Sequence, residues 1–184
     1  MSARHYSGEI KKIKALKKLI PIITTILLMA IFITPVNAQV TGTATGSVTV
    51  LTPIAIANVA NLNFGSVAVS ETGGKVILTP SSLRSISGGL TYPSVAGNVS
   101  AASFKVTGFG SAIYSILLPT SLSISDGAGH SMAINAFTST PSGTGTLSEG
   151  TQIINVGATL NVGASQVAGD YTNSIGFPVV VNYN

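Results

Sequence analysis

Few residues beyond position 38 could carry out acid–base chemistry. His130 is the one histidine there, and Glu71, Asp126, Glu149 and Asp170 are the four carboxylates. A hydrolytic triad would need His130 beside a serine and a carboxylate, but the sequence has no Gly-x-Ser-x-Gly motif of the kind that presents a nucleophilic serine. The carboxylates are scattered and include no close pair suited to glycosidase chemistry. We therefore expect a protein that is not an enzyme and uses no cofactor.

Possible metal ligands come close together in the sequence only in the turn Asp126-Gly127-Ala128-Gly129-His130. A calcium-binding loop alternates acidic ligands along its length, and this turn does not. The chain also has no cysteine. We interpret His130 as a solvated turn residue and predict no metal site.

The first 38 residues have a composition of their own. Six of the nine basic residues lie in the first 18 positions, and an apolar run follows at 19–33. This run is shorter than the ~20 residues of a membrane-spanning helix, and it is followed by the small-x-small ending Val36-Asn37-Ala38. The pattern predicts a secretory signal peptide at 1–38, cleaved between Ala38 and Gln39. An uncleaved membrane anchor is the alternative interpretation.

Cleavage after Ala38 would remove most of the basic side chains, and this decides which partners we expect. Lys75, Arg84 and Lys105 are the remaining basic side chains, too few to neutralise a nucleic-acid backbone. We predict no nucleic-acid partner and no stable membrane span after cleavage. The exported protein would reside in the periplasm, on the cell surface or outside the cell.

The rest of the chain has the pattern of an all-β domain. Its large apolar residues recur at spacings of two, Thr, Val and Ile favour strands, and Gly and Ser favour tight turns. We predict one immunoglobulin-like β-sandwich over 53–184. Strands are expected at 47–57, 62–69, 75–79, 84–90, 103–108, 112–118, 151–162 and 171–184. Gly73-Gly74 is expected to form a turn and Asp126-Gly127 a hairpin turn, with interruptions at Pro53 and Gly157.

The last predicted strand, 171–184, alternates most regularly. One face carries its large apolar side chains, and the opposite face carries Thr172, Ser174, Pro178, Asn182 and Asn184. The apolar face consists of Tyr171, Ile175, Phe177, Val179, Val181 and Tyr183.

Several segments, in order along the chain, resemble a family of secreted bacterial proteins catalogued as domain of unknown function 4402. They are Pro53-Ile54-Ala55-Ile56, Asn61-Leu62-Asn63-Phe64-Gly65-Ser66-Val67, Ala101-Ala102-Ser103-Phe104-Lys105-Val106-Thr107-Gly108, Tyr114-Ser115-Ile116-Leu117-Leu118-Pro119, Leu160-Asn161-Val162-Gly163-Ala164, Ala168-Gly169-Asp170-Tyr171 and Val179-Val180-Val181-Asn182-Tyr183-Asn184. The resemblance covers nearly all of 47–184.

That family in turn resembles pilin subunits of the chaperone–usher kind. The resemblance implies a sandwich that lacks one strand, which the N-terminal extension of a neighbouring subunit completes. The extension 39–52 is then the candidate donor strand, with Val48 and Val50 as its inserting side chains. Ile175, Phe177, Val179, Val181 and Tyr183 are then the candidate C-terminal assembly strand. The implied partners are further copies or neighbouring subunits and a periplasmic chaperone, and the implied role is a structural subunit of an adhesive fibre.

A second interpretation stays open from the sequence. The sandwich could be closed, with 47–57 paired to its own 171–184. The protein would then be a self-contained binding module, secreted or on the cell surface, with its ligand on the loops 126–131 and 139–145.

Overall fold

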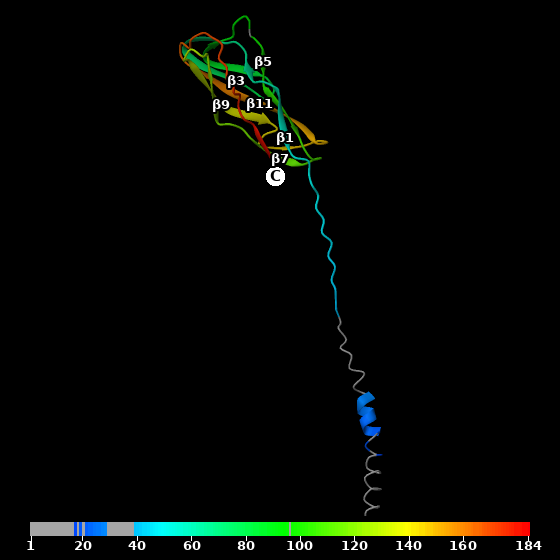
Figure 1. Cartoon of the computed structure of the whole chain (residues 1–184). Coiled ribbons are helices and arrows are strands. Elements are labelled where there is room, and N and C mark those ends of the chain that lie inside the picture. Colours follow the sequence, from blue (N-terminus) through cyan, green and yellow to red (C-terminus); the bar gives the residue numbers. More distant parts are fainter. Residues whose placement is uncertain (1–16, 18, 20, 29–38, 96) are drawn as a thin grey trace, which may run out of the picture. The chain divides into compact units, whose positions relative to one another are not determined.

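The computed structural model describes residues 17, 19, 21–28, 39–95 and 97–184 (Figure 1). The chain divides into two units, Met1–Val48 and Thr49–Asn184. In the first unit, residues 21–28 are helical. Among the described helical residues, no helix has the length and apolar character needed to cross a membrane. Ala38 of the predicted cleavage site lies outside the described residues, whereas Gln39 is described and exposed.

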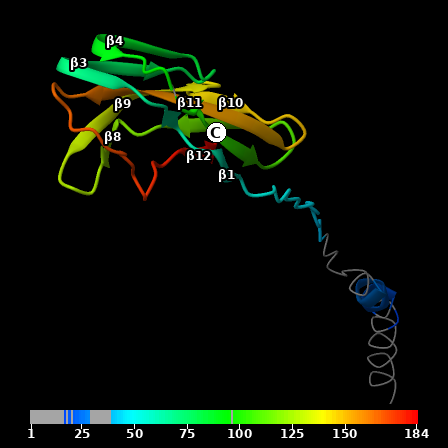
Figure 2. The ribbon, with the colours of Figure 1, turned by 90° about the horizontal axis from the view of Figure 1, so that it is seen from above.

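The second unit is built of antiparallel strands (Figures 1 and 2). Their bounds are β1 (Ala55–Ala60), β2 (Asn63–Phe64), β3 (Ala68–Leu78), β4 (Arg84–Thr91), β5 (Val99–Ser100), β6 (Ala102–Thr107), β7 (Ile113–Leu117), β8 (Ser121–Ser125), β9 (Ser131–Thr140), β10 (Thr144–Thr146), β11 (Thr151–Val162) and β12 (Val180–Tyr183). The largest sheet has the order β1-β6-β11-β3-β4, with β9 also on β11 and β8 on β9. A second sheet has the order β10-β7-β12, and β2 pairs with β5.

Strand β11 organises the large sheet. It pairs with β6 over 151–156, with β3 over 158–162 and with β9 over 155–161. Because the β9 pairing overlaps the other two, β6 and β3 must follow one another along the opposite edge of β11. Gly157 lies where β6 gives way to β3, and a Cβ atom there would be 2.2 Å from the Leu78 carbonyl oxygen. The predicted glycine in this strand is therefore a point of close backbone approach, and the strand continues through it.

Two apolar cores fill the unit, and Leu62 and Phe137 contact both. The first core lies on β2, β3, β4, β8, β9 and the second half of β11, and its buried members are Phe64, Val76, Leu78, Leu90, Ile124, Ile134, Ala158, Leu160 and Val162. The second core lies between the two main sheets, and its buried members are Ala102, Phe104, Val106, Tyr114, Ile116, Leu147, Ile154, Val156 and Val181. Side chains from both sheets meet in the second core, which confirms the predicted all-β sandwich.

Three predicted elements, a turn, a strand and a hairpin loop, are wrong in detail. Gly73-Gly74 makes no turn, because β3 runs through both residues; a Cβ on Gly74 would lie 2.1 Å from the Ser87 carbonyl oxygen. The predicted strand 62–69 is broken at Gly65, whose φ is 69°, between β2 and β3. The β8–β9 hairpin exists, but Ser125 and Ser131 form its last pair, so its loop is longer than a two-residue turn.

The predicted strands at the two ends of the domain are shorter than expected. Residues 47–54 form no strand, and β1 begins only at Ala55, after Pro53. At the C-terminus, pairing with β7 is confined to Val180–Tyr183. Ile175, predicted to share a face with Val181, is 94% exposed. The alternating sequence therefore extends beyond the paired backbone at both ends.

Candidate functional site

The segment before β1 has the sequence of a strand, but among the described residues it has no partner strand. Residues 39–54 adopt neither helix nor strand. Val48 and Val50, the predicted inserting side chains, are 87% and 86% exposed. They alternate with the polar residues Ser47 and Thr49, so an extended backbone places both valines on one face.

Strand β1 is an edge of the large sheet. Its one partner among the described strands is β6, in a register that sets Ile56 opposite Val106. Ile54 and Ile56 are partly buried against the second core, whereas Val59 is exposed. No strand of the described part of the chain pairs with the edge of β1 that faces away from β6.

Strand β12 is an edge of the smaller sheet. Asn184 donates its backbone N–H to the Ile113 carbonyl at 3.2 Å, so the even-numbered residues here direct their backbone groups toward β7. Alternate residues of an antiparallel strand direct these groups to opposite edges. The backbone groups of Val181 and Tyr183 therefore face the free edge, while their side chains pack on the second core.

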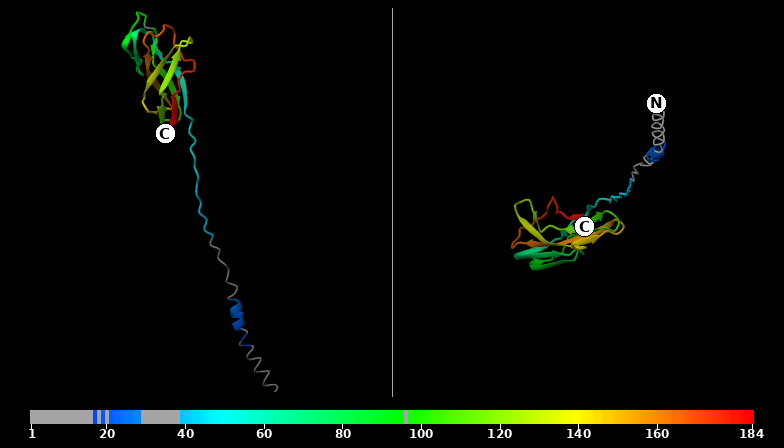
Figure 3. Two further views of the ribbon diagram at one scale, coloured as in Figure 1. Left: turned by 90° about the vertical axis from the view of Figure 1, so that its left-hand side faces the viewer. Right: turned by 90° about the horizontal axis from the view of Figure 1, so that it is seen from below.

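These two edges lie next to each other. Strands β1 and β12 come into contact, and the C-terminus lies beside the start of β1 in every view (Figures 1 to 3). We call this the open side: the side at which the large sheet ends in β1 and the small sheet ends in β12.

Aromatic side chains fill the sandwich beside the open side. The Phe177 ring lies 5.9 Å from that of Phe104, nearly perpendicular to it, and 5.1 Å from that of Phe137, measured between centroids. Val179 and Tyr183 also contact the second core from this segment. Of the predicted C-terminal residues, Phe177, Val179, Val181 and Tyr183 therefore lie together on the second core, and Ile175 does not.

Other edges of the large sheet are covered by their own chain. On β8, Ser125 exchanges backbone hydrogen bonds with Thr172 at 3.0 and 2.9 Å, and the Asn173 amide donates to the Ser123 carbonyl at 3.2 Å. On β4, the Tyr92 hydroxyl donates to the Arg84 carbonyl at 3.2 Å. No local sequence pattern predicts these contacts, because each joins residues whose proximity depends on the topology.

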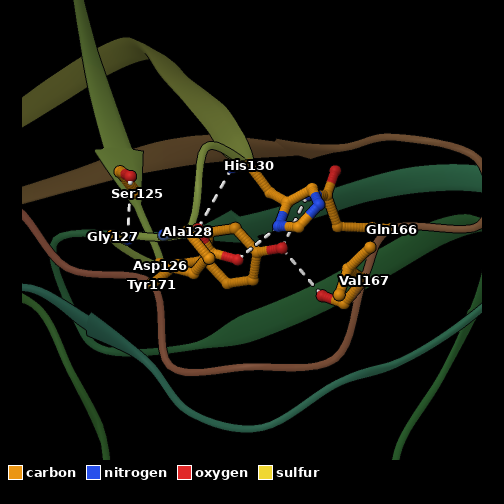
Figure 4. A network of polar contacts seen from close by, with 8 residues as sticks. All are labelled: Ser125, Asp126, Gly127, Ala128, His130, Gln166, Val167 and Tyr171. Carbon is orange, nitrogen blue, oxygen red and sulfur yellow. Dashed lines mark hydrogen bonds and ion pairs between the residues drawn. The ribbon is translucent and has the colours of Figure 1, made fainter.

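A polar network lies at the tip of the β8–β9 hairpin (Figure 4). Asp126 Oδ1 accepts the backbone N–H groups of Ala128 and His130 at 2.8 and 3.1 Å, and Asp126 Oδ2 lies 2.5 Å from His130 Nδ1. Nearby, the Tyr171 hydroxyl donates to the Val167 carbonyl at 2.7 Å. The hydrogen bond from His130, with the two backbone bonds, holds the pKa of Asp126 below its usual value.

This network orders the loop. In the part of the chain that the structure describes, the His130 ring has Asp126 as its hydrogen-bond partner and no serine hydroxyl. No three His, Cys, Asp or Glu residues of that part come together as a possible metal site. The arrangement fits a loop preorganised by Asp126, and it assembles no triad.

Comparison with known proteins gives a family. A family model described as Domain of unknown function (DUF4402) matches residues 54–183. The chain belongs to the DUF4402 family. It matches none of the curated proteins with which it was compared.

The DUF4402 match includes every strand of the sandwich, from β1 to β12. It therefore includes both edges of the open side and the predicted C-terminal residues. Val48 and Val50 lie before the matched residues. The expected membership of this family is confirmed.

Proposed function

We propose that this protein is a non-enzymatic structural subunit of a fimbria-like or surface adhesive fibre, assembled by β-strand exchange. The extension 39–52 of one copy would add a strand at the open side of the next copy. One observation supports this most directly. Among the described residues, an alternating segment has no partner strand, and two adjacent edges, β1 and β12, have one partner strand each.

Strand addition would remove two unfavourable features together. The free edge of β12 presents the backbone groups of Val181 and Tyr183, and each hydrogen bond made to them contributes about 0.5–1.5 kcal/mol net. Val48 and Val50 are exposed to water, and burial of each valine side chain contributes about 1.5–3 kcal/mol. A neighbour's extension would supply both the missing backbone partners and the apolar cover.

Coverage of the other edges supports addition at the open side. Asn173 occupies an outward carbonyl of β8, and Tyr92 occupies one of β4. A row of free backbone groups is what an incoming strand requires. These contacts therefore favour β1 and β12 over β8 and β4 as acceptors.

The charge of the predicted mature chain is compatible with a fibre. After residue 38 there are three basic side chains (Lys75, Arg84, Lys105) and four acidic ones (Glu71, Asp126, Glu149, Asp170), so the net charge is 3 − 4 = −1. Weak net charge limits repulsion between stacked copies. In this proposal the predicted signal peptide exports the chain, and a periplasmic chaperone covers the open side before assembly.

The test is the molar mass in solution, by size exclusion with light scattering, over a wide range of protein concentration. Residues 39–184 should give a ladder of oligomers. Residues 53–184 should stay monomeric and bind a synthetic peptide of residues 39–52, whereas a peptide with Val48 and Val50 replaced by aspartate should not bind. A long form that remains monomeric at every concentration would contradict the proposal.

The self-contained binding module is the second candidate. The ordered hairpin tip favours it, because Asp126 fixes the loop through three hydrogen-bond contacts while the His130 side chain is 43% exposed. A preorganised loop with an exposed polar side chain is a suitable ligand surface. The same mass measurement separates the candidates, since this one predicts a monomer of residues 39–184.

A further inference from the structure

A single hydroxyl group joins both ends of the domain. The Tyr183 hydroxyl, on β12, donates a hydrogen bond to the Thr52 carbonyl at 2.8 Å and accepts one from the Phe109 backbone N–H at 2.7 Å. Gly108 leaves room for it, because a Cβ atom at that position would lie 2.2 Å from the tyrosine oxygen. The last residue of the candidate donor strand is thus fixed by a residue of the candidate acceptor edge.

The extension is joined to β1 of its own copy by a short connection, and this creates a problem for strand exchange between copies. Only Pro53 and Ile54 separate the candidate donor strand from β1, and a reversal that also uses the last residues of the extension would have the length of a common hairpin loop, two to five residues. The extension is therefore long enough to turn back along the free edge of its own β1. With a loop at 51–53, Val48 would lie opposite Ile56, and the apolar faces of both segments would point inward. A copy closed in this way could not donate its strand, and the β1 edge of its open side would be covered.

Two features oppose this closure at the point where the chain would have to reverse. Pro53 has a fixed φ and no N–H to donate, and it disfavours the right-handed α conformation at Thr52 and favours an extended one. The Thr52 carbonyl is also occupied by the Tyr183 hydroxyl. A reversal between Leu51 and Ile54 would reorient this carbonyl and break that bond.

We propose that Tyr183 is a latch that prevents the extension from closing onto its own β1 edge, so that the strand stays available to a second copy of this chain. The latch rests on the proposed function and adds to it a reason why strands exchange between copies. Tyr183 acts on the connection at Thr52 and is a positioning residue for the extension.

Hydrogen exchange of residues 39–50 tests the latch. It is measured by mass spectrometry on residues 39–184, at a concentration where light scattering gives only monomer. In the wild type these amides should exchange as fast as those of an unstructured peptide. Tyr183→Phe should raise the equilibrium constant between the open and the closed extension by about fivefold in favour of the closed one, because one hydrogen bond that holds the open form is lost. Tyr183→Phe with Pro53→Ala should give clear protection that is independent of concentration.

Matched variants separate the latch from general effects on the fold. Tyr92→Phe removes a different tyrosine hydroxyl that also bonds a backbone carbonyl, and it should leave residues 39–50 unprotected. Gly108→Ala provides a second route, because it displaces the Tyr183 hydroxyl and keeps the tyrosine. The amides of β11 report in each variant that the sandwich is intact.

The outcomes for the latch and for strand exchange can be told apart. The latch would be overturned if, in monomers of the Tyr183→Phe, Pro53→Ala double variant, the amides of residues 39–50 still exchanged hydrogen as fast as those of an unstructured peptide. It would also be overturned if these amides were already protected in the wild-type monomer. Protection of wild-type residues 39–50 that appears only as oligomers form supports exchange between copies. A wild type that never forms oligomers overturns the proposed function on which the latch rests.

Discussion

The side-chain amide of Asn173 donates a hydrogen bond to the carbonyl of Ser123, 50 residues earlier in the chain. This bond covers part of the outward edge of β8, and the Tyr92–Arg84 bond covers part of β4 in the same way. Free strand edges invite pairing between molecules, and natural sheets often cover them. In this domain the covering contacts direct pairing toward the open side at β1 and β12.

Charge on the inward face of the candidate donor strand should abolish assembly. Val48→Asp with Val50→Asp would place carboxylates where the proposal buries valines, and burying unpaired charge is strongly unfavourable. We expect the association constant to fall by about a hundredfold or more, measured by light scattering as a function of concentration.

The matched control for this change is Ser47→Asp with Thr49→Asp. It adds the same charge to the same segment but on the opposite face, so oligomers should persist. If both double variants assemble like the wild type, strand exchange through these residues is refuted. If Val48→Asp with Val50→Asp unfolds the monomer, the extension belongs to its own sandwich.

Removal of the Asn173 side chain should expose β8. Asn173→Ala loses the bond to Ser123 and the bonds that its Oδ1 accepts from the backbone of Ile175 and Gly176. We expect a loss of about 1–3 kcal/mol in the free energy of unfolding, measured by urea titration. We also expect aggregation that does not need the extension, so residues 53–184 carrying Asn173→Ala should aggregate while the same wild-type fragment does not. Equal solubility of the two fragments would show that Asn173 does not protect this edge.

The strand pattern in the sequence predicted much of the fold, because alternation is enforced by burial. Strand β11 has the predicted bounds, and its even-numbered side chains Ile154 and Val156 are fully buried. Alternation was misleading at the C-terminus, where Phe177 and Val179 pack on the core although their backbone is not paired. Burial of a side chain and pairing of its backbone are separate constraints, and the sequence pattern reports only the first.

Glycine pairs and free edges depend on tertiary structure, which a single sequence does not show. Gly73-Gly74 is as compatible with a turn as with a strand that another backbone approaches closely, and the contact with Ser87 decides between them. The sequence likewise predicted that Val48 and Val50 alternate with polar residues. It could not show that β12 has β7 as a partner and a free opposite edge, because this follows from how the sheets are assembled.

A side chain at Gly157 should destabilise the sandwich. The Cβ atom of Gly157→Ala would lie 2.2 Å from the Leu78 carbonyl oxygen and 2.6 Å from the Thr79 carbonyl carbon, so the backbone of β3 or β11 must shift. Overpacking of this kind costs about 1–3 kcal/mol, measured as the change in the free energy of unfolding. Gly42→Ala is the control, since a Cβ there meets nothing within 4 Å. Equal stability of the two variants would contradict the close approach of β3 to β11.

Acid should weaken the hairpin tip through Asp126. Hydrogen bonds from His130 and from the backbone lower the pKa of this carboxyl group below its ordinary value of 3.8. The ionised carboxylate therefore stabilises the folded state at pH values above the ordinary pKa, and this contribution disappears as the pH falls through the lower folded value. Between pH 5 and pH 2 the wild type should lose more stability than Asp126→Asn, which has no charge to lose. His130→Ala removes the largest contribution to the shift, so the pKa of Asp126 should move back toward its ordinary value, as measured by carboxyl NMR titration. An Asp126 titration unchanged by His130→Ala would show that the backbone N–H groups alone stabilise the carboxylate.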